Sequence, residues 1–331
     1  MRHRSSRGVK GAFFSLRAQW MLILMVFSLS CVAPFRCKGQ DRNANPEPQK
    51  KAAADFGDWP NIRLYGEFSK RASVMKGTTE PVGNVLASQV VVLEDGVEQP
   101  GVKVSPEDGG ASICLLIDQS SSIREMGKQI VAAAKELVLR SNPASDFCVV
   151  TFDAGVSVLQ DFTQDRERID AALSQVSFGG ASALFDGVAV AFDKLRSRPV
   201  NRRRVLVIFS DGDDNYSRSD LGSLQKRLRY PGSPEVYSIC LPTKSREGGD
   251  NLEGLSRSAG GRTYCLERAG ELSDAGSGVA QLIRNRYLVA YASTHQIRDG
   301  KRHKIEIRLA DSLNASKVKP YFRQEYYAPA Q

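Results

Sequence analysis

The sequence has 331 residues, 41% of them hydrophobic, with 46 Lys and Arg against 37 Asp and Glu and a formal net charge of +9. This length and hydrophobic content are sufficient for a large buried core and exclude a predominantly disordered chain. Seven of the basic residues and no acidic residue fall within residues 1–40, so the rest of the chain is nearly neutral and its charge does not indicate nucleic-acid binding.

Residues 1–39 are predicted to be a signal peptide. Basic residues up to Arg17 precede an apolar stretch of fourteen residues, Trp20–Ala33. A membrane span needs about 20 apolar residues, whereas this length is typical of a signal-peptide core. We therefore expect export to a periplasmic, cell-envelope or secreted location, with no membrane span in the mature chain. An uncleaved anchor helix is the alternative, and the cleavage position and lipidation of Cys31 stay open.

Residues 40–59 are polar, contain prolines and lack periodicity, so they are predicted to be a linker. Residues 60–108 form a predicted N-terminal β segment, in which Asp95-Gly96 lies between β-rich flanks as in a hairpin turn. The stretch "KIEIRL" within residues 287–328 alternates strictly between polar and apolar residues, which indicates strands with one solvated face. Each segment is too small for a domain of its own, so we expect the two to pair as one β module.

Residues 109–286 have the pattern of an α/β domain. Short, continuously apolar runs such as "ICLLID", "FCVVTF" and "VYSICLP" alternate with helix-period segments, the first of them at residues 122–141. Strands that are apolar on both faces and are separated by helices indicate a parallel sheet covered on each side. The predicted fold is therefore a doubly wound, mostly parallel sheet with helices on both faces, Rossmann-like and inserted in a small antiparallel β module.

Four cysteines follow the predicted signal: Cys114, Cys148, Cys240 and Cys265. Their spacing matches no zinc-binding pattern, and the first three lie in apolar runs where free cysteine behaves as a small hydrophobic residue. An oxidising compartment would permit a Cys240–Cys265 disulfide, and the sequence leaves this open.

Oxygen-bearing side chains gather where the predicted parallel strands end. Asp118 ends the first strand and is followed by Ser120 and Ser122, Ser182 lies in a Gly-rich loop, and Asp211 ends another strand. Ligands of open α/β sheets bind at this edge, and an all-oxygen ligand set suits Mg²⁺, with Mn²⁺ or Ca²⁺ as alternatives. Two carboxylates only just neutralise such an ion, so it could still accept a carboxylate from a partner protein.

Simpler interpretations exist for each of these residues. The serines after Asp118, and likewise Ser182, could be helix N-caps, and Asp211-Gly212 could be an ordinary turn. Further residues are candidates for the second coordination shell or the rim of the site, and two of the acidic ones could form a second cation site: Ser121, Asp186, Asp213 and Asp214.

The stretch "DQSSS" fits the D-x-S-x-S pattern, and the sequence resembles von Willebrand factor type A domains, whose metal-ion-dependent adhesion site uses that motif. By position Ser182, in "ASALFDG", matches the threonine of that family, and Asp211 matches its third-loop aspartate. The resemblance implies that the serines ligate metal directly or nearly so and that the aspartates often act through water. Ser121 replaces the usual glycine, and Ser182 lacks the methyl group that stiffens a threonine rotamer. The flanks on either side of this domain are similar to acidobacterial von Willebrand A-related proteins, and the whole resemblance covers about residues 60–328.

An enzymatic function has little support in the sequence. The three histidines, His3, His295 and His303, lie outside residues 109–286, which excludes a Ser-His-Asp triad there. No phosphate-binding G-x-x-x-x-G-K-[ST] motif is present. We expect a non-enzymatic, adhesion-type protein-binding module, in which the cation bridges to an Asp or Glu of the partner. The alternatives are a structural cell-envelope or assembly protein with a merely structural metal and, less favoured, a Mg²⁺-dependent phosphoesterase.

Overall fold

The structure is a computed structural model that describes residues 59–70, 82–197, 199–242, 246–315 and 317–330. All of them belong to one of the two compact units of the chain, Pro48–Gln331. The predicted signal peptide and the predicted linker up to residue 58 lie outside the described residues. Within the described part, no helix combines the length and hydropathy that a bilayer span requires.

A six-stranded sheet forms the centre of the α/β region, in the order β10-β9-β8-β5-β6-β7. Five strands are parallel. The edge strand β7 (Val156–Thr163) runs antiparallel to β6 (Asp146–Phe152), because only three residues connect them and a parallel crossover needs about a dozen. The other strands are β5 (Ala111–Asp118), β8 (Arg203–Ser210), β9 (Glu235–Cys240) and β10 (Arg262–Cys265).

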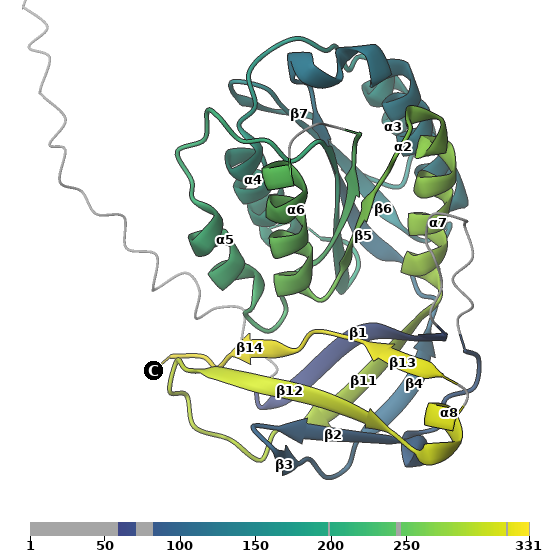
Figure 1. The fold of residues 1–331 in the computed structure, drawn as a ribbon, viewed down its shortest axis with the longest axis vertical. Helices are drawn as coiled ribbons and strands as arrows, with labels where there is room; N and C mark the ends of the chain where they lie inside the picture. Colours follow the sequence, from purple (N-terminus) through teal and green to yellow (C-terminus); the bar gives the residue numbers. More distant parts are fainter. Residues whose placement is uncertain (1–58, 71–81, 198, 243–245, 316, 331) are drawn as a thin grey trace, which may run out of the picture. The chain divides into compact units, whose positions relative to one another are not determined.

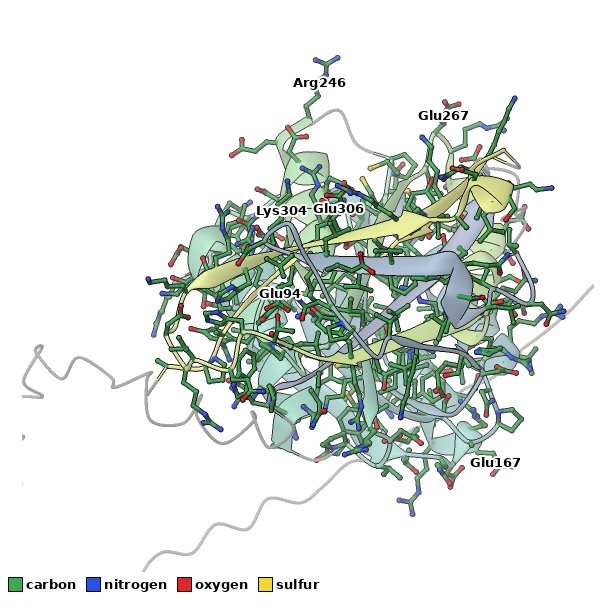
Figure 2. All side chains as sticks on the ribbon, turned by 90° about the horizontal axis from the view of Figure 1, so that it is seen from below. Glu94, Glu167, Arg246, Glu267, Lys304 and Glu306 are labelled. Atoms are coloured by element: carbon green, nitrogen blue, oxygen red, sulfur yellow. The ribbon has the colours of Figure 1, made fainter. Side chains whose placement is uncertain are left out.

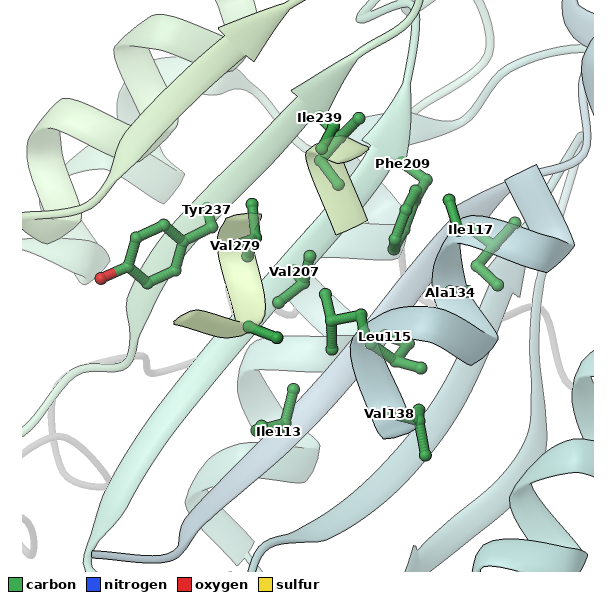
Figure 3. Packing of buried hydrophobic residues seen from close by; sticks show 14 of the residues in the cluster. Ile113, Leu115, Ile117, Ala134, Val138, Val207, Phe209, Tyr237, Ile239 and Val279 are labelled. Atoms are coloured by element: carbon green, nitrogen blue, oxygen red, sulfur yellow. The ribbon is translucent and has the colours of Figure 1, made fainter. Parts of the chain in front are cut away.

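Helices cover both faces of this sheet (Figure 1). One face carries α2 (Gly127–Arg140), α3 (Arg166–Ser174) and α7 (Leu272–Arg284), and the other carries α4 (Leu184–Ser197), α5 (Leu221–Leu228) and α6 (Arg246–Ala259). Successive residues of β5 serve opposite cores: Ile113 and Leu115 pack under α2 and α7 (Figure 3), whereas Cys114 packs on the other side. The predicted doubly wound fold is confirmed.

Two four-stranded antiparallel sheets, built from residues before and after the α/β region, enclose a second core. The first has the order β13-β1-β11-β4 and the second the order β14-β12-β2-β3. The chain turns from β2 into β3 at Asp95-Gly96, both with positive φ, as a two-residue hairpin requires. The strands are β1 (Asn61–Lys70), β2 (Val90–Glu94), β3 (Val97–Glu98), β4 (Lys103–Glu107), β11 (Arg286–Ala292), β12 (Arg302–Leu309), β13 (Val318–Tyr321) and β14 (Glu325–Tyr327).

Short helical segments complete the described chain: η3 (Ala87–Gln89), η4 (Ser121–Met126), η5 (Ala269–Glu271) and α8 (Asp311–Ala315). The four described cysteines are free thiols. Cys240 and Cys265 are register partners on the parallel strands β9 and β10, and their thiols are hydrogen-bonded, which lowers the pKa of Cys265 and raises that of Cys240.

Candidate functional site

The site lies at the carboxyl ends of β5 and β8, which are neighbours at the centre of the sheet. Asp118 is the last residue of β5 and Ser210 the last of β8, so the segments that follow them diverge from adjacent points. A helix was expected from residue 122. The chain instead forms the 3-10 helix η4 from Ser121 to Met126 before α2 begins at Gly127. This tighter winding keeps Ser120 and Ser122 beside the strand ends.

A continuous series of close polar contacts joins four of the predicted ligands. Ser120 Oγ and Ser122 Oγ are 3.0 Å apart, and Ser122 Oγ donates to Asp211 Oδ2 at 2.7 Å. The Ser120 backbone N–H donates to Asp118 Oδ1 at 2.8 Å. Asp118, Ser120 and Asp211 are buried, whereas Ser122 is exposed. The cluster is therefore enclosed by the protein and reaches solvent at Ser122.

Ser120 occupies the N-cap position of η4, but its side chain makes no capping hydrogen bond. True caps do occur elsewhere in the chain: Asp165 accepts backbone N–H groups at the start of α3, and Asp220 does so at the start of α5. The hydroxyls of Ser120 and Ser122 contact each other and Asp211 instead. Helix capping does not explain these two serines.

Ser182 lies beside the same edge but outside this series of contacts. Its hydroxyl donates to the Asp213 carbonyl at 2.7 Å, and its backbone N–H donates to Asn215 Oδ1 at 3.1 Å. The side chain is 2% exposed. Ser182 therefore joins the Gly-rich loop to the loop after β8, and metal ligation by its hydroxyl stays a prediction.

Most of the residues predicted to lie at the rim of the site stabilise loops through hydrogen bonds. Asp186 accepts the backbone N–H groups of Arg218 and Ser219 at 3.0 and 2.9 Å. Asp214 accepts the Phe185 N–H at 2.9 Å and the Ser217 hydroxyl at 2.5 Å. No third carboxylate, imidazole or thiol of the described residues gathers with Asp213 and Asp214, and a second cation site there stays a prediction.

Ser121 is exposed, and its backbone N–H donates to the Gly180 carbonyl at 3.0 Å. The Asp213 backbone N–H approaches Asp211 Oδ1 at 3.3 Å. Both residues thus fix the loops around the cluster through their backbone groups.

The electrostatics of the cluster favour a cation. The pKa of the Asp118 carboxyl is raised to about 7, because burial and the charge of Asp211 together outweigh the lowering by hydrogen bonds from Ser210 and Ser120. The groups that hydrogen-bond to Asp118 and Asp211 are hydroxyls and backbone N–H groups, and no basic side chain of the described residues is among them. Two buried carboxylates without a countercharge are costly unless a proton or a cation compensates them.

The spacing of the donors also fits a small divalent ion. Adjacent ligands of octahedral Mg²⁺, each at about 2.0–2.1 Å, are about 2.9 Å apart. The Ser120–Ser122 and Ser122–Asp211 oxygen separations of 3.0 and 2.7 Å are close to this value. The residues present therefore fit a hard cation such as Mg²⁺ in chemistry, and these separations, which are also those of ordinary hydrogen bonds, are compatible with its ligand spacing.

Ser210 is a site residue that the sequence interpretation missed. Its hydroxyl donates to Asp118 Oδ2 at 2.6 Å and accepts the Gly212 N–H at 2.9 Å. It thus positions the Asp118 carboxylate and the loop that carries Asp211. Its place directly before Asp211 at the end of an apolar strand is a local hint, but it does not show which side chain the hydroxyl contacts.

Comparison with known families identifies a related domain over the part of the chain that carries the site. Residues 113–213 match the family model of the von Willebrand factor type A domain, which spans Asp118, Ser120, Ser122, Ser182 and Asp211. No curated protein matches the sequence.

Among solved structures, a von Willebrand factor type A protein from Catenulispora acidiphila is similar over 82% of this chain and 74% of its own, with 12% identity and a TM-score of 0.47. Proximal thread matrix protein 1 from the mussel byssus, with a zinc-occupied MIDAS motif, is 19% identical over 58% of this chain and 50% of its own, with a TM-score of 0.47. The vWF domain of the type V pili tip protein Mfa5 from Porphyromonas gingivalis is 13% identical, covering 54% and 96%, with a TM-score of 0.42. None is similar enough to transfer a function.

Proposed function

Since this chain carries a von Willebrand factor type A domain, we propose that it is a metal-dependent protein-binding module of the adhesion type. The observation that carries the proposal is the contact series Ser120–Ser122–Asp211, an oxygen cluster spaced for a divalent cation and open to solvent at Ser122. Mg²⁺ is the proposed ion, because hydroxyl and carboxylate oxygens are hard ligands; Mn²⁺ or Ca²⁺ would suit the same groups.

Ser120, Ser122 and Asp211 would hold the ion, with Asp118 and Ser182 completing its surroundings. When bound, the ion supplies a positive centre that accepts a further carboxylate. The two carboxylates of the site balance a divalent charge, so an Asp or Glu of a partner protein can be attracted without displacing either one. Because Asp118 and Asp211 are buried, screening by water is weak around an ion that they surround, which strengthens the interaction of the ion with both carboxylates.

The donor set favours binding over hydrolysis. The groups that hydrogen-bond to Asp118 and Asp211 are hydroxyls and backbone N–H groups, and no Lys or His of the described residues donates to either carboxylate as a candidate general acid. We further propose that residues 1–39 direct export, which would place the module in the periplasm, in the cell envelope or outside the cell.

Calorimetric titration with Mg²⁺ and Mn²⁺ tests the metal site. We expect saturable binding to the wild-type chain and its loss in Asp118→Ala and Ser122→Ala, because each change removes an oxygen of the cluster. Ser121→Ala is the matched control, since this neighbouring serine is exposed and contributes only its backbone to the loop contacts. Equal affinity of Ser122→Ala and Ser121→Ala would contradict the site.

The bridging role needs a second measurement. Peptides that display a single Asp are screened against matched peptides with Asn, each with Mg²⁺ and with a chelator. We expect binders that require both the Asp and the metal. Partner binding that survives chelation would instead favour a structural envelope protein in which the ion only rigidifies the loops.

A further inference from the structure

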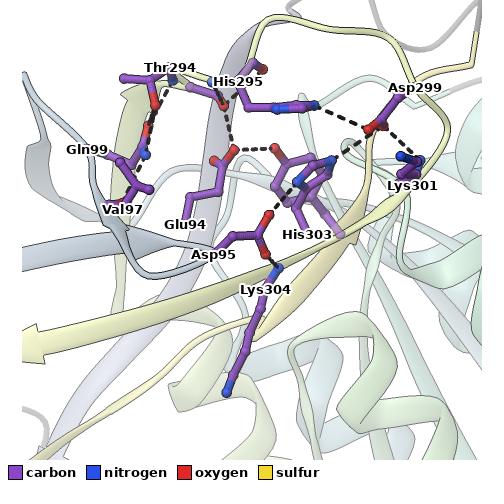
Figure 4. Close-up of polar contacts among 12 residues, drawn as sticks. Glu94, Asp95, Val97, Gln99, Thr294, His295, Asp299, Lys301, His303 and Lys304 are labelled. Atoms are coloured by element: carbon purple, nitrogen blue, oxygen red, sulfur yellow. Dashed lines mark hydrogen bonds and ion pairs between the residues drawn. The ribbon is translucent and has the colours of Figure 1, made fainter.

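Three side chains of the β module converge at a point that the proposed function does not use. His295 and Asp299 come from the connection between β11 and β12, and His303 is the second residue of β12 (Figure 4). Each offers a ligand atom, and these three atoms all lie within 4.8 Å of one another. The two imidazole rings are 4.2 Å apart between centroids.

The distances in this cluster are long for hydrogen bonds. His295 Nε2 lies 3.4 Å from Asp299 Oδ2, and His303 Nε2 lies 3.4 Å from Asp299 Oδ1. Hydrogen bonds from a ring N–H to a carboxylate usually measure about 2.7–3.2 Å. Neighbouring ligands of a tetrahedral zinc ion, each at about 2.0–2.1 Å, are instead about 3.4 Å apart. The observed spacing matches ligands around an ion better than groups bonded to each other.

The contact made by Nδ1 of His303 leaves the other ring nitrogen, Nε2, available as a metal ligand. Its Nδ1 lies 2.7 Å from Asp95 Oδ2, and the other oxygen of Asp95 accepts the Lys304 backbone N–H at 2.8 Å. A carboxylate at Nδ1 fixes the tautomer in which Nε2 carries a free lone pair, as in carboxylate–histidine–zinc arrangements. The ring is 5% exposed and stacks against Tyr326, which restricts its orientation.

His295 supplies an atom that lacks a hydrogen-bond partner. Its Nε2 is buried and makes no hydrogen bond in the described part of the chain, although the side chain as a whole is 31% exposed. A buried nitrogen without a partner is energetically unfavourable. An ion between His295 and Asp299 would give this atom a partner.

The backbone holds the connection in place around these ligands. The Gly300 N–H donates to the Pro329 carbonyl at 3.1 Å, the Ala328 N–H donates to the Lys301 carbonyl at 2.9 Å, and Asp299 is bridged to Ala330. At the other end, Ser293 Oγ accepts the His295 N–H at 3.0 Å. The ligands therefore do not need to be ordered by the ion.

We propose that His295, Asp299 and His303 form a second metal site, selective for a transition-metal dication of the zinc type and independent of the proposed function. Two imidazoles and one carboxylate are the ligands that Zn²⁺ accepts and Mg²⁺ avoids. The ion would join the β11–β12 connection to β12 and, through Asp95, to the turn after β2.

Zinc equilibrium dialysis and cobalt(II) absorption spectroscopy test this site in full-length Asp118→Ala, which lacks the oxygen site. We expect one Zn²⁺ per chain, an intense visible Co²⁺ spectrum and no competition from excess Mg²⁺. His295→Gln should weaken zinc binding at least tenfold. Asp95→Asn, which alters only the second shell, should weaken it by about 10- to 100-fold. If Asp118→Ala does not fold, the wild-type chain can be titrated with Zn²⁺ instead, with excess Mg²⁺ present to occupy the oxygen site.

Ile297→Gln is the matched control, because Ile297 is 62% exposed on the same connection and offers no ligand atom. His295 is partly exposed, so His295→Gln is expected to fold. A substitution of the buried His303 could prevent folding and would then not test the site. Zinc affinity and a Co²⁺ spectrum unchanged by His295→Gln would overturn the proposal. So would the absence of saturable zinc binding in the parent chain.

Discussion

Ser210 connects the sheet to the candidate metal site through one hydroxyl, which holds both the Asp118 carboxylate and the Gly212 N–H. We predict that Ser210→Ala weakens Mg²⁺ binding by about tenfold, because outer-shell partners of ligating carboxylates commonly contribute 10–100-fold to affinity. The loss of stability should be about 1 kcal/mol. Calorimetric titration beside urea unfolding separates the two effects.

Ser238→Ala is the control for that measurement. Ser238 is also fully buried in the sheet, on β9, but its hydroxyl pairs with Ser256 at 3.0 Å, away from the cluster. It should lose similar stability and keep its Mg²⁺ affinity. Equal affinities of the two variants would show that Asp118 needs no positioning by Ser210.

At the same scale, the motif residues could be located from the sequence because strand ends and the D-x-S-x-S spacing are local signals. Ser210 could not be located in this way, because its hydroxyl is recognised as a partner of Asp118 only when β8 is placed beside β5. The pairing of Asp95 with His303 joins residues 208 positions apart and depends on the register between β2 and β12. No local pattern carries that register.

Among the elements, helices α2 and α7 pack closely at a glycine. A Cβ added at Gly276 would lie 2.3 Å from the Ala133 carbonyl oxygen, whereas one added at Gly278 would meet nothing within 4 Å. We predict that Gly276→Ala destabilises the protein by about 1–3 kcal/mol through overpacking. Gly278→Ala should stabilise it by about 0.5–1 kcal/mol, because alanine favours the helix.

Both changes replace glycine by alanine in one helix, so their difference in unfolding free energy isolates the contact with α2. Urea unfolding measures it. Equal stabilisation by the two substitutions would mean that α7 can move away from α2 at little cost.

The elements themselves were largely predictable. Continuously apolar runs identified the buried strands, because a parallel sheet with helices on both faces has no solvated side. The start of the first helix could not be predicted, because the 3-10 helix η4 forms where the chain contacts another loop, for example through the hydrogen bond of Ser121 with Gly180. Such tertiary contacts leave no trace in helical periodicity.

Across the whole described unit, buried ion pairs connect the β module to the α/β region. Glu235 of β9 contacts Arg203 of β8 at 2.9 Å and Arg286 of β11 at 2.8 Å. Arg286 also lies 3.6 Å from Glu67 of β1. All four side chains are almost fully buried, so each charge depends on the others for compensation.

This cluster predicts a specific loss of stability in acid. Burial alone would raise the pKa of Glu235, but the charges and hydrogen bonds of Arg203 and Arg286 hold it at about 2, below the ordinary 4.5. A carboxyl whose folded-state pKa is depressed stabilises the fold above its unfolded pKa and loses that contribution as the pH falls through the folded one. The loss should approach about 3 kcal/mol between about pH 5 and pH 2.

The comparison of wild type with Glu235→Gln isolates this contribution from the other carboxylates. At neutral pH the variant should be less stable by about 3–5 kcal/mol, because it leaves two buried guanidinium groups under-compensated. The difference should shrink as the pH falls towards 2, since protonation of Glu235 then removes the same charge from the wild type. Glu167→Gln is the control, as Glu167 projects from the surface of α3 (Figure 2) and should leave the pH dependence unchanged. A stability difference that stays constant from neutral to acid pH would mean that the charge of Glu235 does not hold the two parts together.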